Sequence, residues 1–291
     1  MAEAKRQLAM YGFDYGTGRN FGSREGHNGG PLLPHSRWPS FFSRIVARLQ
    51  WDANAIDLAE DAKAWPELEN DRRERLTTLF AGFCVAEESV AEELAPFGDF
   101  MTDSLQAWVF YLQKRDEVRH AVLFDRIAKE VLGVAGETPA ERRAAIRDQA
   151  PAPILELFEE RLPALSAEMA AGNAKLEEGV ALYHMILEGI VLTSGQQAIL
   201  QELEDDALPG VRKGVEKVEL DERWHIGFGL RCLVQIKPSD ETLEDLVAQA
   251  GEAAQAWGDV VPAEIVERVK PMTLRRLHAA HLLESHPLEA A

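Results

Sequence analysis

The chain of 291 residues contains only two cysteines, Cys84 and Cys232. Two thiols are too few for a disulfide framework or for a cysteine-bound metal cluster. Basic residues are also scarce, because 31 Lys and Arg stand against 49 Asp and Glu, which gives a formal net charge of −18. Since nucleic-acid affinity depends on clustered Lys and Arg, this balance argues against a nucleic-acid partner.

Long apolar runs are missing as well. No stretch approaches the roughly 18 uninterrupted apolar residues that a membrane-spanning helix requires. The first six residues, Met-Ala-Glu-Ala-Lys-Arg, lack the apolar core of a signal peptide. At the same time 46% of the residues are hydrophobic and 27% are charged, which is a normal globular composition with an ample core. We therefore expect a folded cytoplasmic protein without a membrane span.

Glycine and proline interrupt every helical or strand pattern in the first forty residues. We expect an irregular arm over residues 1–40, a single helical domain over 41–285 and a short tail over 286–291. Within the domain, apolar residues recur at helical spacing and almost no alternating strand pattern is present. The expected helical segments are 72–94, 101–132, 154–171, 176–203, 211–236, 241–257 and 263–283.

Several of these segments are longer than typical globular helices. A coiled coil would show sustained apolar heptads, but the apolar stripes here are broad and contain polar residues. This pattern favours an all-α fold in which several helices form a bundle with a functional interior.

One short pattern occurs twice, as Asp-Glu-Val-Arg-His at 116–120 and as Asp-Glu-Arg-Trp-His at 221–225. Glu and His three residues apart lie on the same face of a helix, so each segment can present one carboxylate and one imidazole to a common ion. A surface ion pair is the ordinary explanation for a single pattern of this kind. Its repetition on two long helices favours a metal site, and only two of the eight histidines have Glu three residues before them.

A di-metal bundle needs two further carboxylates, each from another helix. Glu87 lies thirty residues before Glu117, and Glu188 lies thirty-four residues before Glu222. Glu188 sits within an apolar stretch, where a buried charge would be costly unless it were paired or bound to metal. The position of the first carboxylate has three alternatives nearby: Glu88, Glu92 and Glu93.

Four carboxylates around one cavity would repel each other, and two divalent ions would neutralise them. Oxygen-rich ligation with two imidazoles suits iron and manganese. Each histidine would use one ring nitrogen for metal, and Asp116 and Asp221 could hold the other nitrogen from across the bundle.

At these residues the sequence resembles the ferritin-like di-metal carboxylate proteins, and within them the ribonucleotide reductase small-subunit group. It is most similar to the small-subunit-like ligand-binding oxidases, over about residues 51–236. The resemblance implies an oxidase that activates dioxygen at a manganese and iron pair, although an Fe/Fe pair would accept the same ligands. It also implies a long-chain fatty acid above the metals and a homodimer. The implied metal ligands are Glu87, Glu117, His120, Glu188, Glu222 and His225.

The resemblance further implies an ether link that the enzyme makes in itself. In the oxidases, oxygen activation joins a tyrosine oxygen to the β-carbon of a valine, and the matching residues are Tyr183 and Val90. The β-hydrogen of valine is tertiary and is therefore more readily abstracted than a primary one. Val90 follows Glu87 by three residues, which places it on the same side of a helix.

Two alternatives come from neighbouring families. A radical-generating reductase subunit would carry a tyrosine four residues after the first metal histidine, where this chain has Phe124, and a tyrosine in its C-terminal tail, which we expect to be absent here. A di-iron N-oxygenase would use a further histidine ligand, for which His184 is the candidate. A hydrogen-bonded core histidine is the simpler interpretation, just as Cys84 and Cys232 are expected to pack inside.

The chain departs from the oxidase pattern at one place. Gln196 and Gln197 stand where the oxidases carry a tyrosine, and this changes the polar end of the expected ligand pocket. A third interpretation, a bundle that stores metal or binds lipid without catalysis, would require many ions in each chain or none.

Overall fold

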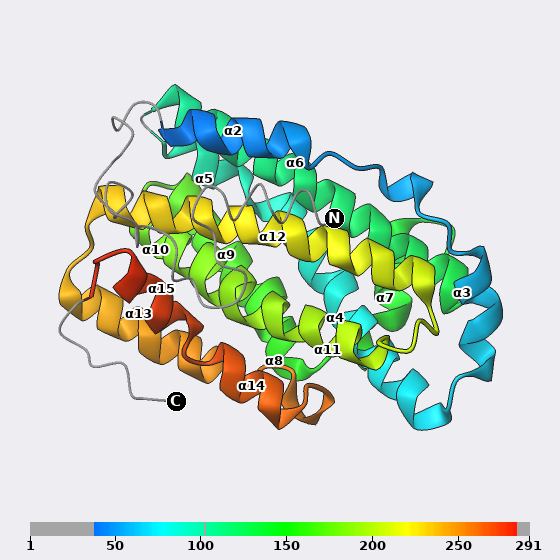
Figure 1. The fold of residues 1–291 in the computed structure, drawn as a ribbon. Helices are drawn as coiled ribbons and strands as arrows, with labels where there is room; N and C mark the ends of the chain where they lie inside the picture. The colour runs from blue at the N-terminus through cyan, green and yellow to red at the C-terminus, as the bar shows by residue number, and fades with distance from the viewer. Residues whose placement is uncertain (1–37, 102, 284–291) are drawn as a thin grey trace.

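The computed structural model describes residues 38–101 and 103–283. Over these residues every regular element is a helix and no strand is present, so the predicted all-α class is confirmed. Figure 1 shows long helices lying side by side in one elongated body. The longer elements are α2 (Trp38–Arg48), α4 (Asn70–Glu93), α6 (Ser104–Arg126), α7 (Pro139–Ile146), α9 (Leu162–Ala170), η7 (Ala181–Leu192), α11 (Thr193–Glu202), α12 (Pro209–Ile236), α13 (Asp240–Ala253) and α15 (Met272–Ala279).

Shorter helical elements join or extend these. They are η2 (Ala53–Ala55), α3 (Ala59–Ala64), η3 (Trp65–Glu67), α5 (Ala95–Asp99), η4 (Ile127–Val131), η5 (Arg147–Gln149), α8 (Ala152–Leu155), η6 (Glu156–Arg161), α10 (Leu176–Val180), η8 (Gly258–Val260) and α14 (Ala263–Val269). The predicted arm over residues 1–40 lies almost wholly outside the described residues, as does the predicted tail over 286–291.

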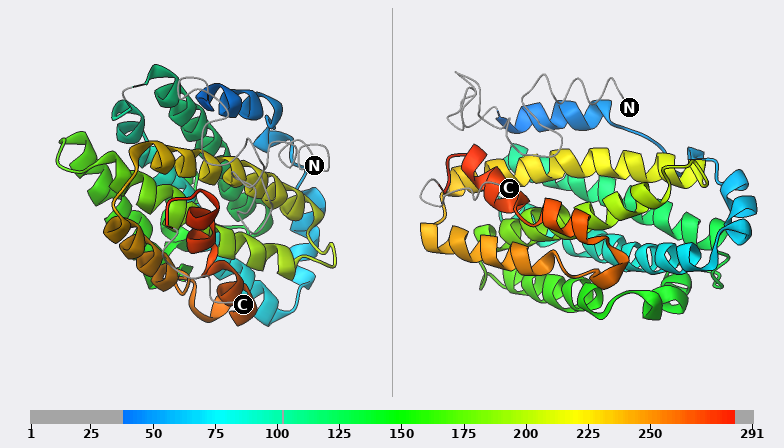
Figure 2. Two further views of the ribbon diagram at one scale, coloured as in Figure 1. Left: turned by 60° about the vertical axis from the view of Figure 1, so that its left-hand side comes forward. Right: turned by 60° about the horizontal axis from the view of Figure 1, so that its bottom comes forward.

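Four long helical runs form the central bundle. They are α4, α6, the continuous run of α10, η7 and α11, and α12. Within it α4 packs against α6 and α11, while α12 packs against η7, α11 and α6. The outer elements form further layers, and the two additional views in Figure 2 show α13 to α15 on one side of the bundle and α2 on another.

Local sequence signals set the ends of the bundle helices. The Asp103 side chain caps α6 by accepting hydrogen bonds from the backbone N–H groups of Leu105 and Gln106. α12 begins at Pro209, whose missing N–H costs nothing at a first helical position, and it ends before Lys237, which adopts a left-handed conformation with φ 57°.

The expected helix over 263–283 is wrong in one respect, because the structure divides it into α14 and α15. Pro271 lies at the break. Proline has no backbone N–H to donate to the preceding turn and its ring clashes with a continuing helix. The Pro271 carbonyl instead accepts the hydrogen bond from Arg275 N at 3.0 Å, and so starts the new helix.

The third helical run of the bundle contains an unusual segment, η7, which is a π-helix of twelve residues. π-Helices are rare and usually last a single turn, so a long one needs support from its surroundings. Side chains that follow α13 donate hydrogen bonds to its carbonyls: Thr273 Oγ1 to Met185 at 3.1 Å, Arg276 Nη1 to Gly189 at 2.8 Å and Trp257 Nε1 to Val191 at 2.7 Å.

η7 and α12 approach each other closely at Gly229. A β-carbon added there would lie 2.3 Å from the His184 Cβ, which is impossible without movement of one helix. The Gly229→Ala protein should therefore lose about 1–3 kcal/mol of unfolding free energy, as overpacked cores do. Gly251→Ala on α13 is the matched control, because its nearest neighbour would be Lys270 Cε at 3.9 Å. The control should be neutral, or more stable by up to about 1 kcal/mol through helix propensity.

Urea unfolding of the two metal-free variants measures this difference. Equal stabilities would show that the two helices can separate at Gly229 at no cost.

Candidate metal centre

The four helical runs of the bundle bring the predicted metal-binding side chains to one place. α4 supplies one carboxylate, η7 supplies another, and α6 and α12 each supply a carboxylate and an imidazole. Every one of these side chains is at least 98% buried. The residues are Glu87 on α4, Glu117 and His120 on α6, Glu188 on η7, and Glu222 and His225 on α12; we call them the metal cluster.

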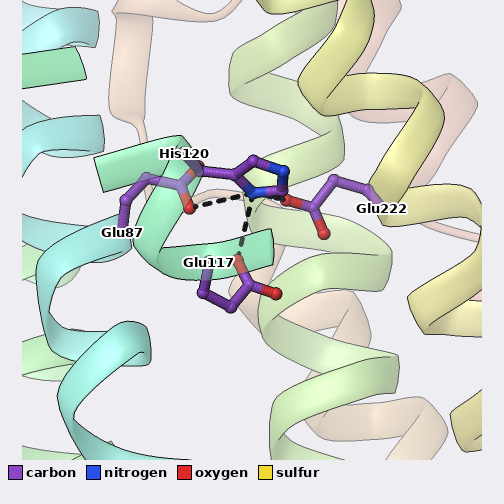
Figure 3. A group of neighbouring side chains, drawn as sticks. All are labelled: Glu87, Glu117, His120 and Glu222. Atoms are coloured by element: carbon purple, nitrogen blue, oxygen red, sulfur yellow. Dashed lines mark hydrogen bonds and ion pairs between the residues drawn. The ribbon is translucent and has the colours of Figure 1, made fainter. Parts of the chain in front are cut away.

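The ligand atoms of the metal cluster form two groups. The first contains Glu87, Glu117, His120 and Glu222, and the atoms they offer all lie within 4.8 Å of one another. Figure 3 shows these four side chains converging from three helices. His120 Nδ1 is 3.1 Å from the Glu117 carboxylate and 3.5 Å from each of the other two.

The second group contains Glu117, Glu188, Glu222 and His225, again within 4.8 Å. His225 Nδ1 lies 2.9 Å from Glu117, 3.0 Å from Glu188 and 3.3 Å from Glu222. Glu117 and Glu222 therefore belong to both groups. Two ions placed in the two groups would share these carboxylates.

The protonation of the cluster reflects burial and mutual attraction. Burial raises the pKa of Glu87 to about 8 and that of Glu188 well above its ordinary value. Burial acts in the same direction on Glu117, but His225 and His120 outweigh it and hold its pKa well below the ordinary range. Burial alone would lower the pKa of the two imidazoles, whereas Glu117 and the other carboxylates raise it well above 6.5.

Several carboxylate oxygens of the cluster have no hydrogen-bond donor. Both carboxylate oxygens of Glu87, both of Glu222 and Oε2 of Glu188 are buried without a hydrogen-bond donor. Such groups are rare in folded proteins and point to an ion or a water. Five bare carboxylate oxygens beside two imidazoles fit a pair of divalent cations that prefer oxygen and nitrogen ligands.

The outer nitrogens of the two histidines behave differently. His120 Nε2 lies 3.2 Å from Asp221 Oδ2 across the bundle, as expected from the sequence. His225 Nε2 lies 3.9 Å from Asp116, which is too long for a hydrogen bond. Arg119, which the sequence interpretation missed, connects both aspartates, with Nη2 at 3.0 Å from Asp116 and 2.7 Å from Asp221.

Trp51 extends this network toward the surface. Its indole Nε1 donates to Asp221 at 2.7 Å, and its ring stacks near His120 with centroids 6.2 Å apart. The Arg119 guanidinium lies 4.8 Å from the ring centroid. Trp51 is half-buried, whereas His120 is fully buried. No local pattern could have identified Trp51, because it lies 69 residues before His120 in the sequence.

Tyr183 and Val90 are both fully buried. The Tyr183 hydroxyl donates to Glu117 Oε1 at 2.6 Å, so the phenol touches a carboxylate of the cluster. Burial and the neighbouring carboxylates raise the pKa of Tyr183 well above 10, which keeps the phenol protonated. Val90 lies one turn after Glu87 on α4.

His184 lies outside both ligand groups. Its Nε2 contacts Gln113 Oε1 at 3.2 Å, and its ring packs edge-on against Tyr183 and Phe110. Burial lowers the pKa of His184 to about 3, so the ring is neutral. It is therefore the hydrogen-bonded core histidine that the sequence favoured.

The remaining predicted positions are also placed. Phe124 stacks on Phe83 with centroids 4.7 Å apart. Cys84 and Cys232 are both buried, as expected. Gln196 is fully buried with no hydrogen-bond partner for its amide, while Gln197 accepts hydrogen bonds from Arg268.

The sequence also matches a known family. The family model of the ribonucleotide reductase small chain matches residues 39–274, and the chain belongs to this family. The resemblance to the small-subunit group is thereby confirmed. Among the described residues, no helix combines the length and the apolar character needed to cross a membrane.

Several solved structures share the fold. The R2-like ligand-binding oxidase from Sulfolobus acidocaldarius has a TM-score of 0.70 and 22% identity, with 86% of this chain and 92% of that chain covered. A variant R2-like ligand-binding oxidase with an anaerobically reconstituted Mn/Fe cofactor has a TM-score of 0.70 and 17% identity, with 85% and 93% covered. A variant with an aerobically reconstituted Mn/Fe cofactor has a TM-score of 0.65 and 19% identity, with 83% and 93% covered.

Metal binding should depend on pH in a defined direction. A Glu87 pKa raised from 4.5 to about 8 stabilises the metal-free fold most below pH 4.5, and this stabilisation is lost as the pH rises through 8. Divalent ions displace the proton, so the increase in unfolding temperature caused by Mn²⁺ should be larger at pH 8 than at pH 6. Calorimetry without oxygen measures it.

Glu87→Gln is the control, because it removes both the titration and a predicted ligand. Its response to Mn²⁺ should be smaller and should vary less with pH. A response in the unchanged protein that is the same at both pH values would contradict the assignment of Glu87.

Proposed function

We propose that the protein is an oxygen-activating oxidase with a manganese and iron pair held by the metal cluster. The observation that carries this proposal is the pair of buried ligand groups, which share Glu117 and Glu222 and contain five oxygens without donors. The Mn/Fe cofactors in the names of structurally similar oxidases support the choice of metals. An Fe/Fe pair would use the same ligands.

The surroundings of the cluster suit the oxidation of a C–H bond. When bound in its reduced form, a metal pair would supply two of the four electrons that the full reduction of dioxygen requires. The bundle interior excludes water, because the side chains of the cluster, of Tyr183 and of Val90 are all buried. Glu117 accepts the phenolic hydrogen bond and so holds the Tyr183 oxygen beside the ligand groups.

We propose that this oxidation forms a new bond between Tyr183 Oη and Val90 Cβ. The phenol loses its hydrogen, Val90 loses its tertiary β-hydrogen, and one C–O bond forms. This releases two protons and two electrons, which go to dioxygen. With the two electrons from the metals and two further protons from solvent, dioxygen is reduced to the level of two water molecules.

We further propose that an apolar molecule resembling a long-chain fatty acid binds close to the cluster. The names of the structurally similar proteins, which are called ligand-binding oxidases, support this. The wholly buried amide of Gln196, without a hydrogen-bond partner among the described residues, could bind the polar part of such a ligand.

Intact mass measures the proposed link. Metal-free protein loaded with Mn²⁺ and Fe²⁺ should lose the mass of two hydrogen atoms after exposure to air. Tyr183→Phe removes the phenol and Val90→Ala replaces the tertiary C–H bond by a primary one, so both variants should keep their mass while still binding two ions. An unchanged mass in the unmodified protein would refute the link.

A second candidate is a radical-generating reductase subunit, and one observation favours it. Trp51, Asp221 and His120 form a hydrogen-bonded chain from a half-buried indole to the metal cluster. Such a chain could carry an electron between a partner protein and the metals. Phe124 cannot form a phenoxyl radical, which favours the oxidase. Activation of a large reductase subunit by the metal-loaded protein would favour the reductase subunit over the oxidase.

The expected homodimer has a candidate surface on α6. The exposed large apolar side chains among the described residues are Trp108, Tyr111, Val118 and Val122, and all lie on this helix. Their spacing places them in one stripe that is centred on Arg115. A contiguous apolar stripe on a soluble protein indicates an interface.

The stripe can pack against the same stripe of a second copy when a two-fold axis passes through Arg115. A cavity of about 190 Å³ opens beside Val118 and Val122, and its apolar wall includes Ala121. A two-fold axis at Arg115 would place Trp108 of a second copy, seven residues from the axis, over Val122, which is seven residues away on the other side. We therefore propose that two copies pack through α6.

Light scattering measures the molar mass that this surface determines. The unmodified protein should have twice the molar mass of one chain. Val118→Glu should have the molar mass of one chain, because the substitution would bury an unpaired charge in the interface. Ala167→Glu, which adds the same charge at an exposed position on α9, should remain a dimer. A monomeric unmodified protein, or a dimeric Val118→Glu protein, would exclude this surface.

A further inference from the structure

A glutamine that no sequence pattern identified lies beside the metal cluster, in contact with Tyr183 and His184. Gln113 is on α6, one turn before Glu117, and it is fully buried. Its Nε2 donates to the Tyr183 hydroxyl oxygen at 2.8 Å and to Glu188 Oε1 at 3.1 Å. Its Oε1 lies 3.2 Å from His184 Nε2. One side-chain amide thus contacts three residues of η7.

The hydrogen atoms of this network have one consistent arrangement when the carboxylates are ionised. Glu117 can only accept, so the Tyr183 hydroxyl must donate to it. The Tyr183 oxygen must then accept from Gln113, and so must Glu188. Only the NH₂ end of the amide can make both donations, which turns the amide oxygen toward His184.

The position of His184 is itself fixed. The ring is held between Tyr183, Phe110 and Phe228, and Gly229 of α12 allows the backbone of η7 to approach. Because the imidazole is neutral, it carries one hydrogen, and the contact with Gln113 Oε1 places this hydrogen on Nε2. The His184 contact is therefore compatible with this direction of the amide, and His184 lies outside both ligand groups.

We propose that Gln113 is a positioning residue that holds both Glu188 and Tyr183 for the metal centre. This inference rests on the proposed function. It assigns to the NH₂ group of Gln113 the task of aligning a metal ligand and the phenol that reacts. Gln113 is not placed in contact with either ion and takes no part in electron transfer.

The effect on Glu188 follows from which oxygen is occupied. Oε1 accepts from Gln113 and lies 3.0 Å from His225 Nδ1, while Oε2 has no donor. Fixing one oxygen orients the carboxylate and leaves the other available to a cation. Hydrogen-bond partners of metal ligands commonly contribute 10–100-fold to metal affinity.

The effect on Tyr183 concerns the oxygen that would form the ether. The Tyr183 hydroxyl accepts a hydrogen bond from Gln113 and donates one to Glu117, so two contacts hold its oxygen in place. An ether oxygen keeps a lone pair, so Gln113 can still donate to it after the phenolic hydrogen has gone. The same contact can thus hold the tyrosine before and after oxidation.

Three variants test the proposal. Gln113→Leu removes the amide, and Gln113→Glu keeps its size and shape but replaces the donating group by an oxygen. Gln106→Leu is the matched control, because Gln106 is also a buried glutamine of α6 and donates to Gln235 at 2.6 Å, outside the cluster network. Each protein is titrated with Mn²⁺ without oxygen, and is separately loaded with Mn²⁺ and Fe²⁺ in air for intact-mass measurement.

In the oxygen-free titration we expect both Gln113 variants to bind one of the two Mn²⁺ ions about tenfold more weakly, while the other ion binds as in the unmodified protein. The control should bind both ions normally. Equal weakening of both ions, the same loss in Gln106→Leu, or unchanged binding in the Gln113 variants would each overturn the proposal.

In air, the unmodified protein and the Gln106→Leu control should form the Tyr183 link, whereas the Gln113 variants should form it at least tenfold more slowly. Linking at the normal rate in the Gln113 variants would overturn the assignment to Tyr183. If the unmodified protein forms no link, the proposed link fails, and the oxygen-free titration alone decides the role of Gln113.

Discussion

Four carboxylates buried around one point constrain the rest of this structure. Isolated charges of this kind would be too costly to keep in a protein interior. The two histidines offset part of the cost, since each places Nδ1 among three carboxylates. The offset is incomplete, because five oxygens have no donor. Two divalent ions would complete it, so metal binding is expected to stabilise the bundle further.

This constraint explains why helices outside the bundle are needed. Glu188 comes from a π-helix, a conformation that is seldom stable over twelve residues. The carbonyls on both sides of Glu188 accept hydrogen bonds from Thr273, Arg276 and Trp257, all of which follow α13 in the sequence. The C-terminal layer therefore does more than cover apolar surface, because it supports the wide helix that carries the predicted ligand Glu188.

The sequence predicted the parts of the site that repeat or that interrupt an apolar pattern. Helical spacing is local, so each Glu-x-x-His pair could be recognised from its own helix, and Glu188 was conspicuous as a charge in an apolar segment. Gln113 and Trp51 belong to no such pattern. Their roles depend on which helices become neighbours, and a single sequence does not contain that information. The break at Pro271 had a local signal, the missing N–H of proline, but the apolar spacing on either side obscured it.

The surroundings of the cluster make its two ends chemically different. At the His120 end, Trp51, Asp221 and Arg119 form a charged network that reaches a half-buried indole. At the Glu188 end, the network of Gln113, Tyr183 and His184 is neutral and fully buried. A charged path to the exterior suits the supply of electrons and protons, whereas a dry aromatic environment protects a reactive oxidant from water. The two ligand groups of the metal cluster contain the same types of residue. Their different surroundings can therefore give the two groups different chemical roles.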